Sequence, residues 1–437
     1  MILRNIEYAL ILGKGKSGLA AQSLLKNECI KYKILNDSDL NISDFYKLCK
    51  QQRFSHCIIS PGFSKFHPWI KIINDLKIYL VPEIELGWSR FNSKTIAVSG
   101  SNGKSTALKL LYDSLKDNFN VSIGGNYGIP ACSIALNECD SEWTLLEVSS
   151  FQLEHVKYFT PDIAMIINIY PNHLDRYISL EDYFITKCKL FGSQENLCSS
   201  CIIPYNQKDV FEKHTDIKRN WITFGCDRNS DYRSFNNKIF KGEDKIADLS
   251  STLFDHKEFL LSTAPATAAV LDKSKISLSN LENAVKYFEI LPHRFEFIAK
   301  HMGVNFINDS KATNLHAVES AIKSCSQPIK LLAGGRLKQK NMTFFKEKLA
   351  EYKVSLYLYG ESASFLNACF SEVVPCTLCT TLYEAFLAAC HDAISGDTIL
   401  LSPGCASFDQ FNDYKDRGKQ FRLMVKEHIE DINKGDR

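Results

Sequence analysis

The stretch Thr95–Thr106, with the sequence TIAVSGSNGKST, decides the fold of this chain. An apolar strand, Thr95–Ser99, leads into the turn Gly100–Gly103, and Lys104 opens a segment whose apolar residues fall on one helical face, at Ala107, Leu108, Leu111 and Leu115. Glycines let backbone N–H groups approach an anion, and a helix N-terminus adds donors and a positive dipole end. The stretch therefore predicts a phosphate-binding strand, loop and helix.

Within this loop, Lys104 is predicted to reach the β- and γ-phosphates, and Ser105 or Thr106 to hold Mg²⁺ through a hydroxyl. The usual pattern G-x-x-x-x-G-K-[ST] wants a glycine where Val98 stands, so the loop is a shortened variant. An ordinary strand–turn–helix is the alternative, but every part follows in the order that phosphate binding requires.

The composition is that of a globular protein with several domains. The 437 residues are 45% hydrophobic and 23% charged, a length that suits two to four domains. With 52 basic and 50 acidic residues, the net charge of +2 gives no electrostatic reason to expect nucleic acid as a partner. No apolar run approaches the ~20 residues of a membrane span, and the N-terminus lacks a signal-peptide pattern, so we expect a cytoplasmic protein without membrane insertion.

In that compartment the 15 cysteines are expected to be free thiols, mostly in the core. Two C-x-x-C pairs occur, Cys198/Cys201 and Cys376/Cys379, far apart and without histidines at ligand spacing. A zinc site built from both is the less favoured interpretation.

A nucleotide-binding βαβ unit is predicted at the N-terminus. The buried strand 8–12 is followed by Gly13-Lys14-Gly15-Lys16-Ser17-Gly18, a G-x-G-x-x-G motif that opens a helix, and the next strand, 32–35, ends at Asn36-Asp37. Asp37 stands where an acid could meet a ribose. On its own the motif suggests a dinucleotide or a plain glycine turn. A further strand, 56–59, ends at Ser60-Pro61-Gly62, and 89–94 reads as a linker.

Polar residues then follow the ends of two more apolar strands. Glu147 ends the strand that begins at Trp143, and the strand 163–169 is followed by Tyr170-Pro171-Asn172-His173. Ligands of open parallel sheets gather at such strand ends. Glu147 is the expected Mg²⁺ partner of the phosphate loop, with a solvated carboxylate as its alternative.

The segment 183–191 (YFITKCKLF) is predicted to be a helix whose apolar face carries Lys187 but not Lys189. A lysine on a buried stripe needs a partner or a function. The alternative is that the Lys187 side chain extends along the apolar face and places its ammonium at the surface. Residues 198–262 are predicted to hold short strands and turns, in CIIPYN, WITFG and KEFLL.

A third α/β unit follows residue 291. Strands predicted at 304–307, 329–332, 356–359 and 398–401 alternate with helical stretches. Its loops carry the residues 309–314 (DSKATN), 334–335 (GG) and 402–407 (SPGCAS).

Together these motifs make the chain resemble the Mur ligases of peptidoglycan synthesis, and within them the D-glutamate-adding branch. The resemblance covers nearly the whole chain. It rests on GSNGKST (100–106), GNYGIP (125–130), LLEVSSFQLE (145–154), NHLDRY (172–177), LPHRFE (291–296), NDSKATN (308–314) and SPGCASFDQF (402–411).

The resemblance implies an α/β protein of three domains. Residues 1–92 would form a Rossmann-like domain for the UDP-substrate, 93–290 a central P-loop ATPase-like domain, and 291–437 a Rossmann-like domain for the amino acid. The implied reaction is ATP-dependent amide formation between UDP-N-acetylmuramoyl-L-alanine and D-glutamate, through an acyl phosphate. ATP and two Mg²⁺ ions are the implied cofactors, and a monomer is expected.

The resemblance also implies roles for individual residues. The catalytic set is Lys104, Glu147, His173 and Lys187. ATP contacts are expected from Gly100, Ser101, Asn102, Gly103, Lys104, Ser105, Thr106, Arg294 and Asp309. UDP-substrate contacts are expected from Lys16, Ser17, Asn36, Asp37, Ser60, Pro61, Gly62, Asn126, Ser149 and His173. The D-glutamate pocket would comprise Lys311, Thr313, Lys338, Ser407 and Phe408. The metal ligands would be Ser105, Glu147, His173 and a carbamylated Lys187.

Three positions and one stretch depart from the family pattern. Asn172 replaces an aspartate before the metal histidine, Arg336 replaces an acid after the glycine pair, and Asn36 stands where the uracil-side loop often has aspartate. The family's asparagine-containing adenine motif is not evident in 261–270. Since none of these touches the phosphate loop, Glu147, His173 or Lys187, we expect an active enzyme.

Three alternatives remain at this stage. A folylpolyglutamate synthase is disfavoured by the N-terminal nucleotide unit, and a diaminopimelate-adding Mur ligase by the absence of a D-N-P-R motif. The third alternative is a catalytically inactive nucleotide-binding protein, which the missing adenine motif motivates.

Overall fold

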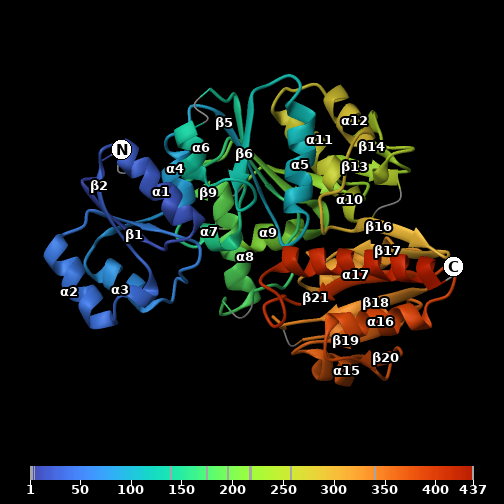
Figure 1. Ribbon diagram of the computed structural model, residues 1–437. Coiled ribbons are helices and arrows are strands. Elements are labelled where there is room, and N and C mark those ends of the chain that lie inside the picture. The colour runs from blue at the N-terminus through green and yellow to red at the C-terminus, as the bar shows by residue number, and fades with distance from the viewer. Residues whose placement is uncertain are drawn as a thin grey trace. The chain divides into compact units, whose positions relative to one another are not determined.

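The described residues fold around three large, mainly parallel sheets, beside one short antiparallel pair of strands (Figure 1). The computed structural model describes residues 3, 5–137, 140–173, 176–193, 196–215, 219–255, 258–338 and 341–435. These fall into two units. The larger holds Met1–Ile169, Arg176–Asp255 and Leu260–Phe288, and the smaller holds Tyr170–Asp175, His256–Phe259 and Glu289–Arg437. Each sheet lies within one of the three expected domain ranges, whose boundaries stay predictions.

The amino-terminal sheet has the order β2-β1-β3-β4, with all its neighbours parallel. Its elements are β1 (Tyr8–Leu12), α1 (Lys16–Asn27), β2 (Lys31–Leu35), α2 (Ile42–Gln52), β3 (His56–Ile59), α3 (Pro68–Asp75), β4 (Tyr79–Pro82) and α4 (Glu83–Trp88). Side chains alternate across a strand, so Ala9 and Ile11 join the core under α1, whereas Leu10 and Leu12 join the core under α2 and α3. The predicted βαβ unit is confirmed.

The central sheet has the order β15-β14-β13-β12-β11-β8-β5-β7-β6, parallel from β6 to β13 and antiparallel beyond. Its first elements are β5 (Lys94–Ser99), α5 (Lys104–Leu115), β6 (Val121–Gly125), α6 (Ala131–Asn137), β7 (Trp143–Glu147), α7 (Ser150–Leu153), β8 (Ile163–Ile166) and α8 (Leu180–Cys188). The pair β9 (Gly192–Ser193) and β10 (Asn196–Leu197) follows, with β11 (Ser200–Pro204), α9 (Lys208–His214), β12 (Trp221–Gly225), β13 (Tyr232–Phe235), β14 (Lys238–Lys241), β15 (Asp244–Asp248), α10 (Glu258–Leu261), α11 (Thr263–Lys273) and α12 (Ser279–Lys286).

The carboxyl-terminal sheet has the order β16-β17-β21-β18-β19-β20, parallel except for β16. Its elements are β16 (Glu296–His301), β17 (Val304–Asn308), α13 (Leu315–Lys323), β18 (Ile329–Gly334), α14 (Thr343–Leu349), β19 (Val354–Tyr359), α15 (Ala363–Phe370), β20 (Cys376–Leu378), α16 (Leu382–Asp392), β21 (Thr398–Gly404) and α17 (Tyr414–Gly435). Two hydrophobic cores, one on each face, cover this sheet.

Several sequence predictions are corrected here. The KEFLL stretch is not a strand: Glu258–Leu261 form the single helical turn α10, and Lys257 lies outside the described residues. A short apolar run reads alike in a buried strand and a buried helix. The helix expected from 183 begins at Leu180, because the Ser179 hydroxyl caps it, and the strand expected to reach 169 ends at Ile166.

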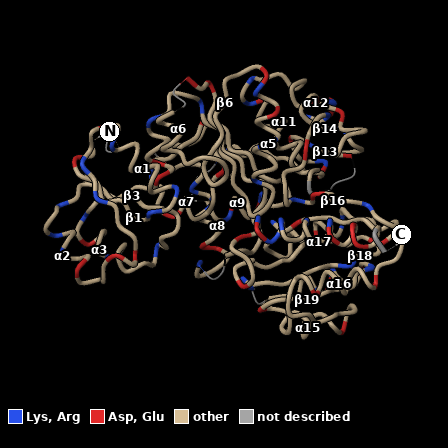
Figure 2. The backbone as a smooth tube through the Cα atoms, viewed as in Figure 1, with Lys and Arg blue, Asp and Glu red and all other residues tan. Residues whose placement is uncertain are grey.

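Charge is spread rather than clustered, in keeping with the near-neutral sequence. Figure 2 shows lysines and arginines interspersed with acidic residues along the backbone. Within the described ranges, no helix has both the length and the apolar character needed to cross a membrane.

Glu83 offers a test of the packing between α4 and α6. It is 2% exposed, accepts a hydrogen bond from the Cys132 N–H at 2.7 Å, and burial raises the pKa of its carboxyl from 4.5 to about 7. Because ionisation is disfavoured only in the folded state, the free energy of unfolding should fall as the pH rises from 4.5 through about 7, by up to about 3 kcal/mol.

We predict that Glu83→Gln removes this loss. Thermal melting of both proteins at pH 5 and pH 8 checks it, since all other titrating groups are shared. An unchanged difference between the two pH values in the variant would contradict the prediction.

Candidate functional site

The phosphate loop lies between the carboxyl end of β5 and the start of α5. Gly100 and Gly103 have positive φ angles of 151° and 81°, which side chains rarely adopt. The Lys104 ammonium donates to the carbonyls of Gly100, at 2.7 Å, and Ser101, at 3.1 Å. The N–H groups of Ser101 and Asn102 donate to Asn168, which fixes the loop against the strand end of β8. The loop has the predicted strand and helix on either side.

A hydroxyl and a carboxylate meet beneath this loop. Ser105, 1% exposed, donates from its hydroxyl to Glu147, which is 3% exposed, and Asn126 Nδ2 donates to the other carboxylate oxygen at 2.6 Å. The strand order β5-β7-β6 brings these residues together, because the carboxyl ends of parallel neighbours share one edge. Hard oxygen donors of this kind suit Mg²⁺.

Lys187 is buried beside the same loop. It is 1% exposed, and its ammonium donates to Ser99 Oγ at 3.3 Å and to the Gly100 carbonyl at 3.0 Å. Burial first, and the Lys104 charge second, hold the pKa of Lys187 well below its usual range. The alternative with a surface-exposed ammonium is therefore wrong.

Other expected residues flank this centre. Thr106 is buried in the first turn of α5, and Ser149 caps α7 by accepting the Gln152 N–H. His173 lies in the segment 170–173, which belongs to the smaller unit, and its positive φ of 57° accompanies a hydrogen bond from its N–H to Asn172 Oδ1. In the described part of the chain no three His, Cys, Asp or Glu side chains converge as a metal cluster.

The amino-terminal sheet has a cavity of about 400 Å³, which opens at the carboxyl ends of β1, β2 and β3. All seven residues expected there for the UDP-substrate line it: Lys16, Ser17, Asn36, Asp37, Ser60, Pro61 and Gly62. Lys14 of the glycine motif also lines it, as do Phe63 and His67, which sequence reasoning missed. Asn126 and Ser149 do not line this cavity: Asn126 contacts Glu147 beside the phosphate loop, and Ser149 follows Val148, whose carbonyl accepts from Ser99 Oγ.

The D-glutamate candidates lie in the loops of the carboxyl-terminal unit. Lys338 donates to Thr313 Oγ1 at 3.4 Å, and the Lys311 ammonium lies 3.7 Å from the Tyr414 ring centroid. Ser407 is 2% exposed, whereas the Phe408 side chain is largely exposed. The structure thus brings Lys338 and Thr313 into contact.

The same unit holds a half-buried carboxyl, Asp309, directly after β17, and a fully buried guanidinium, Arg417, on α17. Burial raises the pKa of Asp309 to about 7, although it accepts hydrogen bonds from the Phe295 N–H and the Ser402 hydroxyl. The charge of the half-buried Arg294, whose sequence neighbour Phe295 donates its N–H to Asp309, acts in the opposite direction and lowers this pKa. Arg417 is 0% exposed and donates to the carbonyls of Ser310 and Cys405. Sequence reasoning missed Arg417. The signal was its spacing, because Arg417 lies four and eight residues before the apolar Phe421 and Val425, which are buried on the same helix face.

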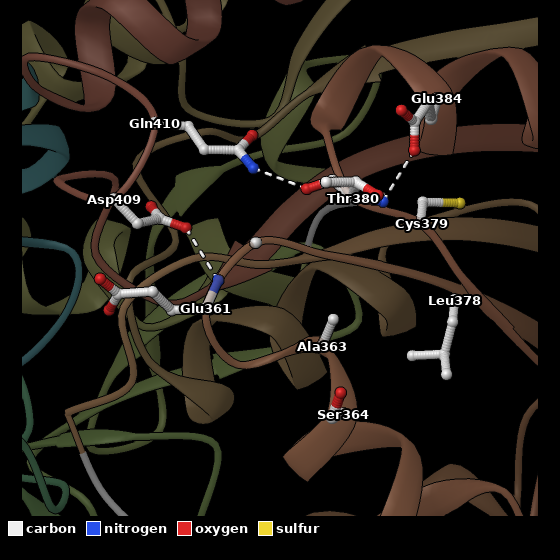
Figure 3. Close-up of a pocket in the computed structure, with 10 residues that line it drawn as sticks. Glu361, Ala363, Ser364, Leu378, Cys379, Thr380, Glu384, Asp409 and Gln410 are labelled. Carbon is white, nitrogen blue, oxygen red and sulfur yellow. Dashed lines mark hydrogen bonds between the residues drawn. The ribbon is translucent and has the colours of Figure 1, made fainter.

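A cavity of about 490 Å³ in the same unit contains none of the expected residues (Figure 3). Its polar groups join loops to one another: Asp409 accepts the Glu361 N–H at 3.2 Å, Gln410 donates to the Thr380 carbonyl at 2.7 Å, and Glu384 accepts the Thr380 N–H at 2.8 Å.

Comparison with known proteins gives two family matches. Residues 98–266 match the family described as Mur ligase middle domain, and residues 293–405 match the one described as Mur ligase, glutamate ligase domain.

Full-length relatives extend these matches. A Hydrogenobaculum sp. (strain Y04AAS1) protein named UDP-N-acetylmuramoylalanine--D-glutamate ligase is 34% identical over 96% of this chain and 99% of its own length. A protein of the same name from Koribacter versatilis (strain Ellin345) is 31% identical, over 97% and 98%.

Solved structures show the same fold. The MurF ligase from Thermotoga maritima in complex with ADP has a TM-score of 0.61 at 15% identity, covering 98% of this chain and 97% of that one. The UDP-N-acetylmuramate-alanine ligase MurC of the same organism has a TM-score of 0.59 at 14% identity, over 97% and 100%. The predicted α/β class with three sheets is confirmed.

Two glycines of the amino-terminal motif give a matched test of the close contact between α1 and the loop after β1, beside the amino-terminal cavity. A Cβ at Gly18 would lie 1.8 Å from the Gly13 carbonyl oxygen, whereas a Cβ at Gly15 would meet nothing within 4 Å. We predict that Gly18→Ala destabilises the protein by at least about 1 kcal/mol, the scale of overpacking, and that Gly15→Ala leaves the melting temperature nearly unchanged. Equal melting temperatures of the two variants would contradict this account of the helix–strand contact.

Proposed function

This chain belongs to the Mur ligase family, and on that premise we propose that it is an ATP-dependent ligase that adds D-glutamate to UDP-N-acetylmuramoyl-L-alanine. One observation carries the proposal: two ammonium groups, Lys104 and Lys187, and the Ser105–Glu147 pair meet at a single phosphate loop. The choice of substrates is supported by full-length relatives that carry the D-glutamate ligase name.

The chemistry would consist mostly of positioning and charge neutralisation. The L-alanyl carboxylate takes the γ-phosphoryl group of ATP and becomes an acyl phosphate, which the amine of D-glutamate attacks as phosphate leaves. Lys104 would neutralise charge on the transferring phosphoryl group. Gly100–Thr106 would hold the phosphates, and Arg294 and Asp309 would contact the nucleotide from the carboxyl-terminal domain. Ser105 and Glu147 would hold one Mg²⁺, and His173 with carbamylated Lys187 a second, to supply Lewis-acid stabilisation.

The substrates would occupy three places. The amino-terminal cavity would take the UDP moiety, with Asn126, Ser149 and His173 on the side of the reacting carboxylate. Lys311, Thr313, Lys338, Ser407 and Phe408 would form the D-glutamate pocket, where cationic and hydroxyl groups suit a dicarboxylate. We assign residues 1–92, 93–290 and 291–437 as the corresponding domains, in a monomer.

A coupled assay tests the function. ADP release should require both UDP-N-acetylmuramoyl-L-alanine and D-glutamate, and L-glutamate and diaminopimelate should be poor substrates, because the wrong isomer leaves buried polar groups unpaired. Equal use of L-glutamate would remove the D-glutamate assignment and keep the family chemistry. ATP turnover that depends on neither substrate would contradict both.

Lys187 gives the sharpest test of the mechanism. Carbamylation by CO₂ needs the neutral amine, which burial favours here, and it yields a carboxylate suited to Mg²⁺. We predict that Lys187→Ala is nearly inactive and that formate or acetate partly restores turnover by filling the vacated place. Full activity of a folded variant would exclude Lys187 from the mechanism. Inactivity without rescue would argue against the carbamylated form.

A further inference from the structure

Two charged residues of the family motifs have no role in the chemistry above: Glu154, which ends LLEVSSFQLE, and Arg176, in NHLDRY. They form a buried, bidentate ion pair. Arg176 Nε donates to Glu154 Oε1 at 2.7 Å and Nη2 donates to Oε2 at 2.9 Å, with 13% and 0% of the two side chains exposed. The guanidinium also lies 4.0 Å from the Phe151 ring centroid, so its plane is fixed on two sides.

The pair holds one wall of the amino-terminal cavity. Arg176 Nη2 donates to the Phe63 carbonyl at 2.8 Å, and Glu154 Oε2 accepts the Lys65 N–H at 3.1 Å. Gly62 and Phe63 line that cavity. The backbone of 63–65 therefore contacts both members of the pair.

The same contacts reach both ends of α8, the helix that carries Lys187. Near its start, Asp182 pairs with the Lys65 ammonium at 2.5 Å. Just beyond its end, the Lys189 ammonium donates to the Glu154 carbonyl at 2.6 Å. Lys65 and Glu154 therefore connect the segment that forms the cavity wall with both ends of α8.

The energetics favour a geometric role over a stabilising one. A buried ion pair adds little net stability, because the cost of removing both charges from water offsets most of their attraction. A bidentate guanidinium–carboxylate contact is highly directional, however, so it can fix two segments in one arrangement.

We infer that Glu154 and Arg176 are positioning residues that hold the wall of the UDP-substrate cavity at a set distance from α8. They would thereby place the reacting carboxylate of the bound substrate against Lys187 and the phosphate loop. The inference rests on the proposed function, because it needs the cavity to hold that substrate.

Arg176→Lys tests this role, since it keeps the positive charge and loses the bidentate hydrogen bonding of the guanidinium. The matched control is Arg90→Lys: Arg90 makes the same bidentate contact with Glu28, at 2.9 and 3.0 Å, and is also largely buried, but neither residue lines the cavity. Steady-state kinetics are measured with each of the three substrates in turn.

We expect Arg176→Lys to raise the KM for UDP-N-acetylmuramoyl-L-alanine about tenfold, the scale of losing one charge-assisted hydrogen bond. It should lower kcat as well and leave the KM for ATP unchanged. Arg90→Lys should lower the melting temperature and leave all three KM values unchanged. An unchanged KM for the UDP-substrate in Arg176→Lys, or the same kinetic change in both variants, would overturn the inference.

Lys65→Met keeps the test usable if Arg176→Lys does not fold, because the Lys65 side chain is 24% exposed. The substitution removes the ion pair with Asp182 and the ammonium over the Phe66 and Tyr177 rings, and it keeps the backbone N–H that donates to Glu154. The KM for the UDP-substrate should rise here too, by a smaller factor, and no rise would overturn the inference. Failure of the proposed function would be distinct, since the wild-type protein itself would then form no amide.

Discussion

The carbonyl of Gly100 accepts hydrogen bonds from two ammonium groups, Lys104 and Lys187, and the candidate site depends on this convergence. Burial lowers the pKa of Lys187 most, and repulsion from the nearby Lys104 charge lowers it further. The arrangement concentrates positive charge where a polyphosphate would lie, and burial makes the Lys187 amine easier to neutralise than an exposed lysine. Under the proposed function, Lys104 would neutralise phosphate and the buried Lys187 would react with CO₂, although both ammonium groups donate to one loop oxygen.

The sheet order provides the surroundings of that oxygen. Because β5 lies between β7 and β8, Glu147 comes from one neighbour and the Asn168 segment follows the other. Parallel neighbours end at the same edge, so these groups meet without any long connection. The amino-terminal sheet follows the same rule, and its cavity opens at the ends of β1, β2 and β3.

Sequence reasoning located these parts because their signals are local. A strand, a glycine turn and a periodic apolar face each occupy a few consecutive residues, so β5, α5 and the buried face of Lys187 followed from the pattern. The antiparallel strand β16 was missed, since its burial is only partial and its partner decides its pairing. The Glu154–Arg176 pair was missed for a related reason: its members are 22 residues apart, and only the folded chain brings them together.

The shortened phosphate loop shows how a departure from a motif can preserve its geometry. Val98 stands at the usual glycine position, but it is a fully buried strand residue paired with Glu147 on one side and Met165 on the other. The strand therefore continues to Ser99, and Gly100 makes the turn with a φ of 151°. A Cβ at Gly100 would lie 3.2 Å from the Asn102 carbonyl and 3.3 Å from that of Asn168, so the requirement for glycine has moved two residues along. Because the Lys104 ammonium donates to the Gly100 carbonyl, the shorter loop still holds this ammonium beside the turn that would bind the phosphates.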